Sequence, residues 1–296
     1  MKYLVTGGAG FIGSNLVDSL ISMGHEVIVI DNSCNKEKKY WNKKAKNYNY
    51  NINDYKNTKN LYIGVDCVFH MAAECRIQNT IKNPLKAIET NILGTAVVLQ
   101  CSLESGVKKV IYSSTSSAYG NNGVPYVETQ KENYLNPYSL SKVSGEKICK
   151  MYSDLYDIQT VSLRYFNVYG NRQPESKEFG LVLGIFRRQK REGKPLSIIG
   201  DGLQKRDFTH VQDVVDANIL IANKALDKKY WGDVFNIGSG QNYSIKSIAS
   251  MISCDTISLE DRPAESKETL ANIEKAKNVF GWFPQFNVID WIKNNE

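Results

Sequence analysis

The chain has 296 residues, of which 42% are hydrophobic and 23% are charged, and its formal net charge is +6. This length allows one large domain or two ordinary ones, and the composition is that of a globular protein. No apolar run reaches the roughly eighteen residues that would predict a membrane-spanning helix. A strand predicted to begin at residue 2 or 3 leaves no room for a signal peptide, so we expect a cytoplasmic protein.

The remaining composition argues against a metalloprotein and against a nucleic-acid partner. The six cysteines are scattered without CxxC spacing and the three histidines lie far apart, so we expect free thiols and no metal site. The basic run KEKKYWNKKAK at 36–46 is interpreted as a solvated loop or helix face, with a nucleic-acid contact as the alternative. A mild positive charge also suits a small ligand that carries phosphates.

Strands and helices alternate through the first half of the chain. We predict strands at 2–7, 25–31, 65–73, 107–114 and 159–168, and helices at 10–24, about 84–105 and about 137–156. Such alternation is typical of parallel strand pairing, and it predicts an α/β fold with a doubly wound parallel sheet of the Rossmann type.

Beyond residue 170 the pattern changes. A polar loop at 171–180 precedes helix-like residues at 181–192 and the run PLSIIGDG at 195–202, whereas VFNIGSG at 234–240 looks like a buried strand that returns to the sheet. We therefore expect a Rossmann domain and a smaller C-terminal α/β domain. The first would comprise residues 1–169 plus about 206–239, and the second about 170–205 plus 240–296.

A glycine-rich turn, TGGAGFIG at 6–13, follows the first predicted strand and opens a helix. Gly7, Gly10 and Gly13 would provide a sharp turn, close approach of a pyrophosphate, and tight packing of the helix on the sheet. The helix N-terminus supplies unpaired N–H groups for phosphates. Asp31 ends the second strand, where a carboxylate binds the ribose hydroxyls and repels a 2′-phosphate, so the pattern favours NAD over NADP.

Tyr138 and Lys142 in PYSLSK are four residues apart and share one helix face. A free tyrosine has a pKa of about 10 and is a poor base at neutral pH. We expect the nearby ammonium and a positively charged nicotinamide to lower that pKa towards the working range. The preceding strand ends in YSSTSSAYG at 112–120, which is rich in hydroxyl groups and contains no carboxylate.

In this order the motifs resemble the extended short-chain dehydrogenase/reductase family, in particular its nucleotide-sugar epimerases of the UDP-glucose 4-epimerase type. The resemblance covers nearly the whole chain, through TGGAGFIG (6–13), HMAAECRIQNTIKNP (70–84), NILGT (91–95), SSTSSAYG (113–120), PYSLSK (137–142), RYFNVYG (164–170), GDGLQKRDFTHVQDVVDA (200–217), FNIGSG (235–240) and FGWFP (280–284). It implies an NAD-binding first domain, a nucleotide-sugar-binding second domain, a UDP-sugar substrate and a homodimer.

The resemblance also implies roles for single residues. Thr115, Tyr138 and Lys142 would be catalytic, with Tyr138 transferring a proton and Lys142 holding the cofactor ribose. The implied cofactor-binding residues are Gly7, Gly10, Phe11, Ile12, Gly13, Asp31, Asn32, Asn51, Ile52, Ala72, Ser113, Tyr138 and Lys142. Asn51 departs from the family, which has aspartate there. The implied substrate-binding residues are Thr115, Asn167, Arg206 and Arg262, and guanidinium groups suit a diphosphate.

Related dehydratases carry acidic residues after the threonine, whereas this chain has Ser116 and Ser117, which are too weak as acids or bases to eliminate water. The sequence therefore favours NAD-dependent inversion at C4 of a UDP-hexose through a transient 4-keto sugar. The alternatives are a uronate epimerase, a reductase, a dehydratase or a non-catalytic cofactor sensor.

Two further positions bear on the sugar that is bound. Counting from Arg262 places Thr269 where related enzymes decide whether an N-acetyl group fits, and threonine is small enough to admit one. Arg76 stands where related sequences carry a small residue near the sugar. It would meet a charged sugar such as a uronate, or it would point into solvent.

Overall fold

The protein is described from a computed structural model that covers residues 1–33, 40–176 and 180–295. Within these residues a seven-stranded sheet has the order β11–β6–β5–β4–β1–β2–β3, and every neighbouring pair is parallel. Its strands are β1 (Lys2–Thr6), β2 (Glu26–Ile30), β3 (Lys46–Tyr48), β4 (Cys67–His70), β5 (Lys109–Thr115), β6 (Gln159–Tyr165) and β11 (Asp233–Ile237). The predicted doubly wound parallel sheet is confirmed.

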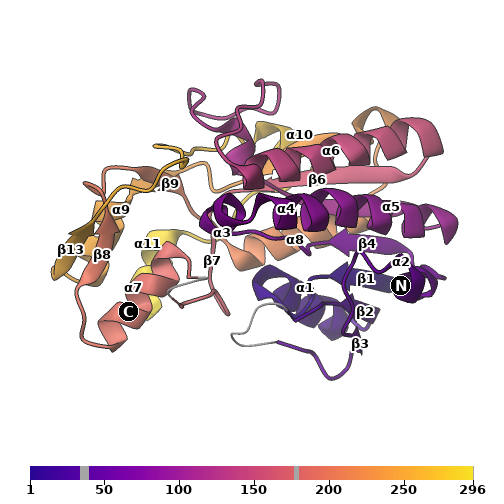
Figure 1. Ribbon diagram of the computed structural model, residues 1–296, viewed down its shortest axis with the longest axis horizontal. Coiled ribbons are helices and arrows are strands. Elements are labelled where there is room, and N and C mark those ends of the chain that lie inside the picture. Colours follow the sequence, from indigo (N-terminus) through magenta and orange to yellow (C-terminus); the bar gives the residue numbers. More distant parts are fainter. Residues whose placement is uncertain (34–39, 177–179, 296) are drawn as a thin grey trace.

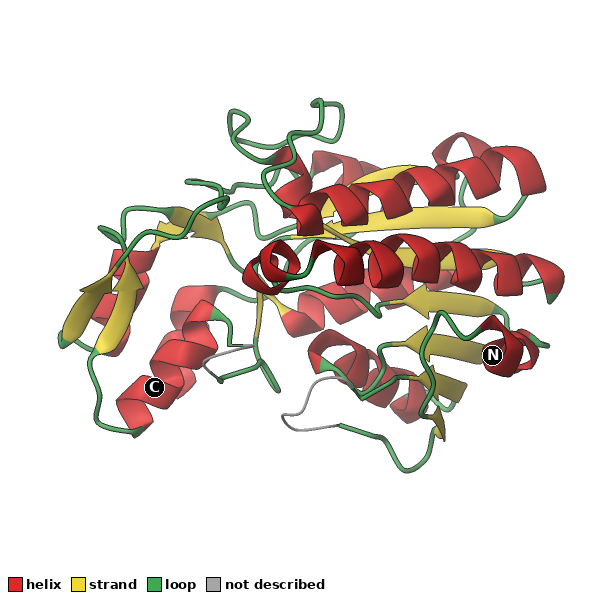
Figure 2. Cartoon of the chain, viewed as in Figure 1, coloured by secondary structure: helices red, strands yellow, loops and turns green. Residues whose placement is uncertain are grey.

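Helices cover both faces of this sheet (Figures 1 and 2). One face carries α1 (Phe11–Ser22), α8 (Val211–Asn223) and α10 (Glu274–Phe280), and the other carries α5 (Gly94–Glu104) and α6 (Pro137–Tyr156). Successive strand residues point to opposite faces. Val5 therefore packs in one core with Leu16 of α1, whereas Leu4 packs in the other core with Leu99 of α5.

The start of α6 fixes the first of the predicted catalytic side chains. Asn136 accepts a hydrogen bond from the Ser139 backbone N–H at 2.8 Å, its own N–H donates to the Ser139 hydroxyl at 3.3 Å, and Pro137 occupies the first helical turn. This capping box starts the helix one residue before Tyr138. The helix predicted at 84–105 is instead divided into α4 (Pro84–Ala87), a π-helical turn (Ile88–Leu93) and α5.

Short helices connect the larger elements. They are α2 (Tyr55–Thr58), a 3₁₀ turn at Lys59–Tyr62, α3 (Ile77–Lys82), a 3₁₀ turn at Ser116–Tyr119 and another at Lys228–Tyr230. In the basic run at 36–46, residues 36–39 lie outside the described part, and residues 40–45 are irregular backbone leading into β3. Residues 177–179 of the predicted loop at 171–180 also lie outside it.

A smaller lobe lies beside the sheet, at the left of Figure 1. It contains β8 (Leu196–Ile199) paired in parallel with β13 (Thr256–Leu259), packed against α7 (Val182–Arg191), α9 (Ile245–Ile252) and α11 (Val288–Asn295). Two strand pairs complete the described elements, β9 (Lys205–Asp207) with β12 (Asn242–Ser244), and β7 (Val168–Tyr169) with β10 (Thr209–His210). We propose the domain boundaries expected from the sequence, with β11 returning to the main sheet, except that α10 packs on the main sheet although it lies within 240–296.

None of the helices in the described residues has the length and apolar character needed to cross a bilayer. The five described cysteines, Cys67, Cys75, Cys101, Cys149 and Cys254, are free thiols.

Candidate active site

The strand order reverses beside β1, because β2 follows it on one side and β4 lies on the other. In such sheets ligands bind outside the carboxyl ends of the strands at this point. Thr6, at the end of β1, contacts His70, at the end of β4, with 2.7 Å between Oγ1 and Nδ1. The backbone N–H groups of Met71 and Ala72 each donate to the Thr6 hydroxyl at 3.2 Å. The loops that follow the two strands are therefore held together.

The glycine-rich turn is packed too closely for larger side chains. Gly7 has a φ of +69°, and a Cβ there would lie 2.7 Å from the Ala72 nitrogen. A Cβ on Gly13 would lie 2.2 Å from the Gly7 carbonyl oxygen. Gly10 is the N-cap of α1 and provides no side-chain cap. The first-turn N–H groups, beginning at the half-buried Phe11 and Ile12, thus remain available to an anionic ligand.

Asp31 lies against this turn. Its carboxylate accepts hydrogen bonds from the Ala9 N–H at 3.1 Å and the Ser33 N–H at 2.8 Å. Its own N–H donates to the Tyr48 carbonyl, so the end of β3 lies alongside. Asn32 is exposed.

The segment after β3 places Asn51 and Ile52. Asn51 uses its side-chain oxygen to accept from the Asn53 N–H at 3.0 Å, and Ile52 is buried against Gly94. The side chain of Asn53 is buried, and neither its oxygen nor its nitrogen has a hydrogen-bond partner among the described residues. No sequence motif marks Asn53, and its unpaired amide is a candidate contact for a ligand.

Thr115 and Tyr138 come from different elements and meet at this edge of the sheet. Thr115 ends β5 and caps the following 3₁₀ turn, because its hydroxyl oxygen accepts from the Ser117 N–H at 3.1 Å. Its O–H is then free to donate elsewhere. Tyr138 is half-buried in the first turn of α6, and the Thr115 side chain, as a hydrogen-bond partner, acts to lower the Tyr138 pKa.

Lys142 lies one turn further along α6 and is only 2% exposed. Its Nζ is 4.1 Å from the centre of the Tyr112 ring. Burial lowers the pKa of Lys142 to about 8, which leaves the side chain mostly protonated at neutral pH. Burial and the Lys142 charge lower the pKa of His70 to about 3, so His70 is a neutral structural residue.

One expectation about Tyr138 is wrong for the protein alone. We expected the Lys142 ammonium to lower its pKa, but burial raises that pKa above its usual value and dominates the balance. The groups that lower it are Thr115 and Arg76. Desolvation disfavours phenolate, so the residues of the chain hold Tyr138 as a neutral phenol at neutral pH.

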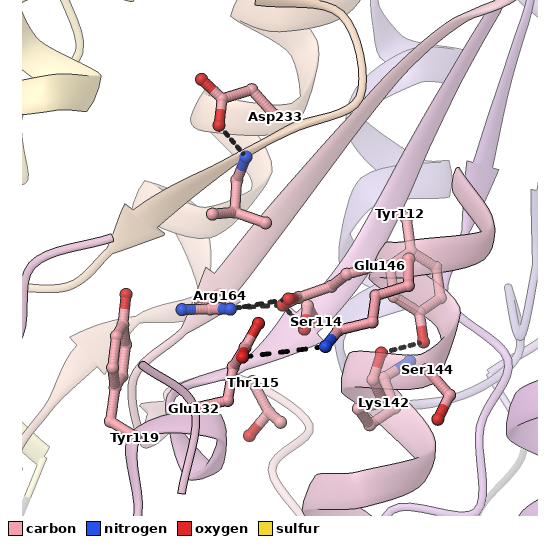
Figure 3. Close-up of polar contacts among 12 residues, drawn as sticks. Tyr112, Ser114, Thr115, Tyr119, Glu132, Lys142, Ser144, Glu146, Arg164 and Asp233 are labelled. Carbon is pink, nitrogen blue, oxygen red and sulfur yellow. Dashed lines mark hydrogen bonds and ion pairs between the residues drawn. The ribbon is translucent and has the colours of Figure 1, made fainter. Parts of the chain in front are cut away.

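A buried ion pair beneath the site was also missed (Figure 3). Glu146 of α6 contacts Arg164 of β6 through two hydrogen bonds, at 2.8 and 2.7 Å, and accepts another from the Ser114 hydroxyl. Ser114 and Thr115 are successive strand residues and point to opposite faces. The pair therefore joins β5, β6 and α6 on the face away from Thr115. Its one sequence signal is the helical spacing of Tyr138, Lys142 and Glu146.

Ser113 precedes these residues on β5. Its hydroxyl lies 3.1 Å from the Tyr165 hydroxyl, which also contacts Asn218 of α8. Ser113 is buried in this network at the carboxyl end of the strand.

The predicted substrate-binding residues lie towards the small lobe. The Asn167 amide donates to the Asp207 carbonyl at 2.9 Å and to the Thr269 hydroxyl at 3.0 Å. The half-buried Arg206 side chain donates to the Lys205 and Lys267 carbonyls and lies 3.9 Å from Glu265. Arg262 is exposed, with no hydrogen bond or ion pair inside the described chain. The structure thus groups Asn167 with Thr269 and leaves Arg262 at the surface.

A family model described as the NAD dependent epimerase/dehydratase family matches residues 3–238. The chain belongs to this family. This match confirms the resemblance inferred from the motifs. The chain is therefore an NAD-dependent enzyme.

Three relatives illustrate the range of this family. A UDP-glucose 4-epimerase from Lacticaseibacillus casei is 34% identical over 316 residues, covering 99% of this chain and 94% of that protein. A UDP-N-acetyl-alpha-D-glucosaminuronate decarboxylase from Bacillus cytotoxicus is 37% identical over 260 residues, covering 85% and 79%. The crystal structure of the UDP-glucose 4-epimerase with UDP-glucose from Thermotoga maritima has a TM-score of 0.93 at 34% identity, covering 99% of this chain and 96% of that one.

The residues present fit NAD. The turn at Gly7 and Gly13 leaves no room for side chains, and the uncapped start of α1 offers N–H groups to a pyrophosphate. Asp31, held against the glycine-rich turn, would repel a 2′-phosphate on the cofactor ribose. The unpaired Asn53 amide lies beside Ile52, the position that the motif comparison gives to adenine.

Proposed function

We propose that this enzyme inverts C4 of a UDP-hexose, namely UDP-glucose or UDP-galactose or their N-acetyl forms, through a transient 4-keto sugar. The observation that carries the proposal is the meeting of Thr115 with Tyr138, one helical turn from the protonated Lys142, next to two serines in place of acids.

Each residue of the triad has a separate task. The Thr115 oxygen already accepts from the Ser117 N–H, so its own hydrogen is directed to the sugar O4 or to the Tyr138 oxygen. Tyr138 would act as a phenolate, a form that a positively charged nicotinamide beside it would favour, and would take the proton from O4 and later return it. Lys142 would hold the ribose of the cofactor through its ammonium hydrogens. When bound, NAD⁺ supplies the oxidant for C4 and, once reduced, the reductant.

The absence of an acid beside Thr115 supports a reaction without elimination. Ser116 is buried, and Ser117 uses its N–H to hold Thr115. Glu146, one turn beyond Lys142, is already held by Arg164 and Ser114 on the opposite side of β5. Elimination of water needs a proton donor and acceptor near neutral pH, and serine hydroxyls are too weak for it.

The small lobe and the residues beside it provide the side chains that we propose bind the nucleotide. Arg206 and Asn167 would hold the diphosphate, and Asn167 would exchange its present N–H contacts with Asp207 and Thr269 for the phosphate oxygens. Arg262 would close on the diphosphate from the surface, while the sugar stays free to turn and present its other face. Thr269 is buried and its hydroxyl accepts from Asn167 and from the Asp207 N–H. What Thr269 offers the sugar is therefore small size, which leaves room for an N-acetyl group.

We further propose a homodimer through the helices on the α6 side of the sheet. Several large apolar side chains are exposed on α4, the π turn and α6, namely Leu85, Ile88, Leu93, Leu140, Met151 and Leu155. Helices α4 and α6 lie together in the described structure, so these exposed side chains belong to neighbouring elements on the same face of the sheet (Figure 1). Two such surfaces would bury each other's apolar area.

The test is incubation of the purified enzyme with UDP-glucose or UDP-N-acetylglucosamine and added NAD⁺ alone, followed by proton NMR of the sugar. A C4-inverted product with no net change in NAD⁺ is expected. Loss of water or carbon dioxide would contradict the argument from Ser116 and Ser117. In a parallel sample that contains NADH in place of NAD⁺, conversion that occurs only there and consumes NADH stoichiometrically would identify a reductase instead.

A further inference from the structure

The segment just before Arg76 is held against the catalytic helix. The Asn91 side chain accepts from the Glu74 N–H at 2.8 Å and donates to the Glu74 carbonyl at 2.9 Å, and it also donates to the Ser141 hydroxyl at 2.9 Å. Ser141 lies between Tyr138 and Lys142 on α6, and its hydroxyl donates to the Tyr138 carbonyl at 2.9 Å. Arg76 follows two residues after this clamp.

The guanidinium of Arg76 has unused hydrogen-bonding capacity at this site. Arg76 is half-buried at the N-cap of α3, where its side chain makes no capping bond. Its Nε is buried without a hydrogen-bond partner in the described structure, and no ion pair with a described carboxylate involves it. The Arg76 charge is nevertheless close enough to Tyr138 to lower the pKa of that phenol. A buried unpaired donor on a cation is unfavourable unless a ligand completes it.

The reacting carbon limits which ligand group can reach Arg76. If O4 of the sugar lies at Thr115 and Tyr138, then C6 is only two bonds from the reacting C4. A carboxylate at C6 would place an anion in the same neighbourhood as Tyr138. The planar guanidinium fork matches a carboxylate through two parallel charge-assisted hydrogen bonds, whereas a neutral hydroxymethyl group cannot neutralise it.

We propose that Arg76 binds the C6 carboxylate of a nucleotide uronate, so that the same site also takes a UDP-uronate and binds it more tightly than the neutral UDP-hexoses proposed above. This inference rests on the proposed function, because it takes the sugar C4 to lie at Thr115 and Tyr138. Arg76 is then a specificity-determining residue, and neutral hexoses leave its charge unpaired.

The test measures affinity by calorimetry on the NAD-loaded protein, using UDP-glucuronate, UDP-glucose and UDP as probes. The variants are Arg76→Gln, Arg76→Lys and Lys82→Gln, the last removing one charge from the exposed end of the same helix. We expect the wild type to bind UDP-glucuronate at least tenfold tighter than UDP-glucose. Arg76→Gln should remove that preference, Arg76→Lys should restore part of it because lysine keeps the charge without the fork, and Lys82→Gln should keep it.

Equal losses for both sugars in Arg76→Gln, or a wild type without preference, would overturn the inference. NMR of the products on the same samples separates this inference from the proposed function. C4 inversion of UDP-glucose without a uronate preference would contradict the role of Arg76 alone. Tighter binding of UDP-glucuronate that depends on Arg76, without C4 inversion of either sugar, would contradict the proposed reaction. It would still support the carboxylate site at Arg76.

Discussion

Tyr112 and Lys142 contact each other twice. The Tyr112 hydroxyl donates to the Lys142 carbonyl at 3.1 Å, and the Lys142 ammonium lies 4.1 Å from the centre of the Tyr112 ring. The first contact joins β5 to the catalytic helix, and the second offers the buried cation the face of an aromatic ring. This arrangement keeps the Lys142 ammonium where water cannot solvate it. Burial of this charge therefore lowers the free energy of unfolding.

Replacement of Lys142 tests whether burial of its charge lowers the stability of the fold. Its pKa falls from 10.5 to about 8 on folding, so the unfolded chain binds more protons between these values. Stability should therefore rise as pH rises from about 8 towards 10. Lys142→Met should remove this rise and stabilise the fold at pH 7 by about 1–3 kcal/mol, while weakening NAD binding. Urea denaturation at pH 7 and pH 9 measures the stabilisation and the loss of its pH dependence, with the exposed Lys150→Met as control.

Tyr138→Phe removes the proposed proton carrier and little else. We expect turnover to fall by about 10²–10⁴-fold because proton transfer from O4 loses its acceptor. NAD binding should persist, which intrinsic fluorescence or calorimetry can check. Tyr134→Phe, at an exposed tyrosine just before the same helix, is the matched control and should retain turnover. Appreciable C4 inversion by Tyr138→Phe would rule out its assigned role.

Gly10 and Gly13 should respond differently to alanine. A Cβ on Gly13 would lie 2.2 Å from the Gly7 carbonyl, so Gly13→Ala forces helix α1 off the turn and should cost about 1–3 kcal/mol of stability. A Cβ on Gly10 has 3.3 Å to the nearest described atom, so Gly10→Ala should fold but bind NAD more weakly. Thermal melts with and without NAD distinguish the two. Equal stability losses in both variants would contradict this division of roles.

The proposed dimer depends on apolar residues such as Leu155, which is 67% exposed in the single chain. Leu155→Glu would place a charge in the buried interface and should shift the protein to monomers. Sedimentation velocity at micromolar concentration measures the change, and Leu203→Glu, at an exposed leucine of the small lobe, is the control. A wild type that sediments as a monomer would refute the dimer.

The strands and helices of the first half could be predicted because each leaves a local signal. The alternation of buried runs with helices predicted β1, β2, β4, β5 and β6, whereas the short and largely exposed β3 was missed. Asn136 with Pro137 marks the start of α6. The glycine turn and the Tyr138–Lys142 spacing likewise depend on short-range patterns. The Asn91 clamp and the Glu146–Arg164 pair join residues 17 and 18 positions apart, so only the folded chain shows them. The pKa of Tyr138 depends on burial, which no spacing reveals.

The most direct measurement of the central claim follows one hydrogen atom. The enzyme with NAD⁺ would be given a UDP-hexose or UDP-uronate deuterated at C4, in ordinary water, and the product examined by NMR. The account predicts a C4-inverted product that keeps its deuterium at C4, because the same atom leaves and returns while Tyr138 exchanges only the hydroxyl proton. An inverted product that has lost its deuterium to solvent would contradict it.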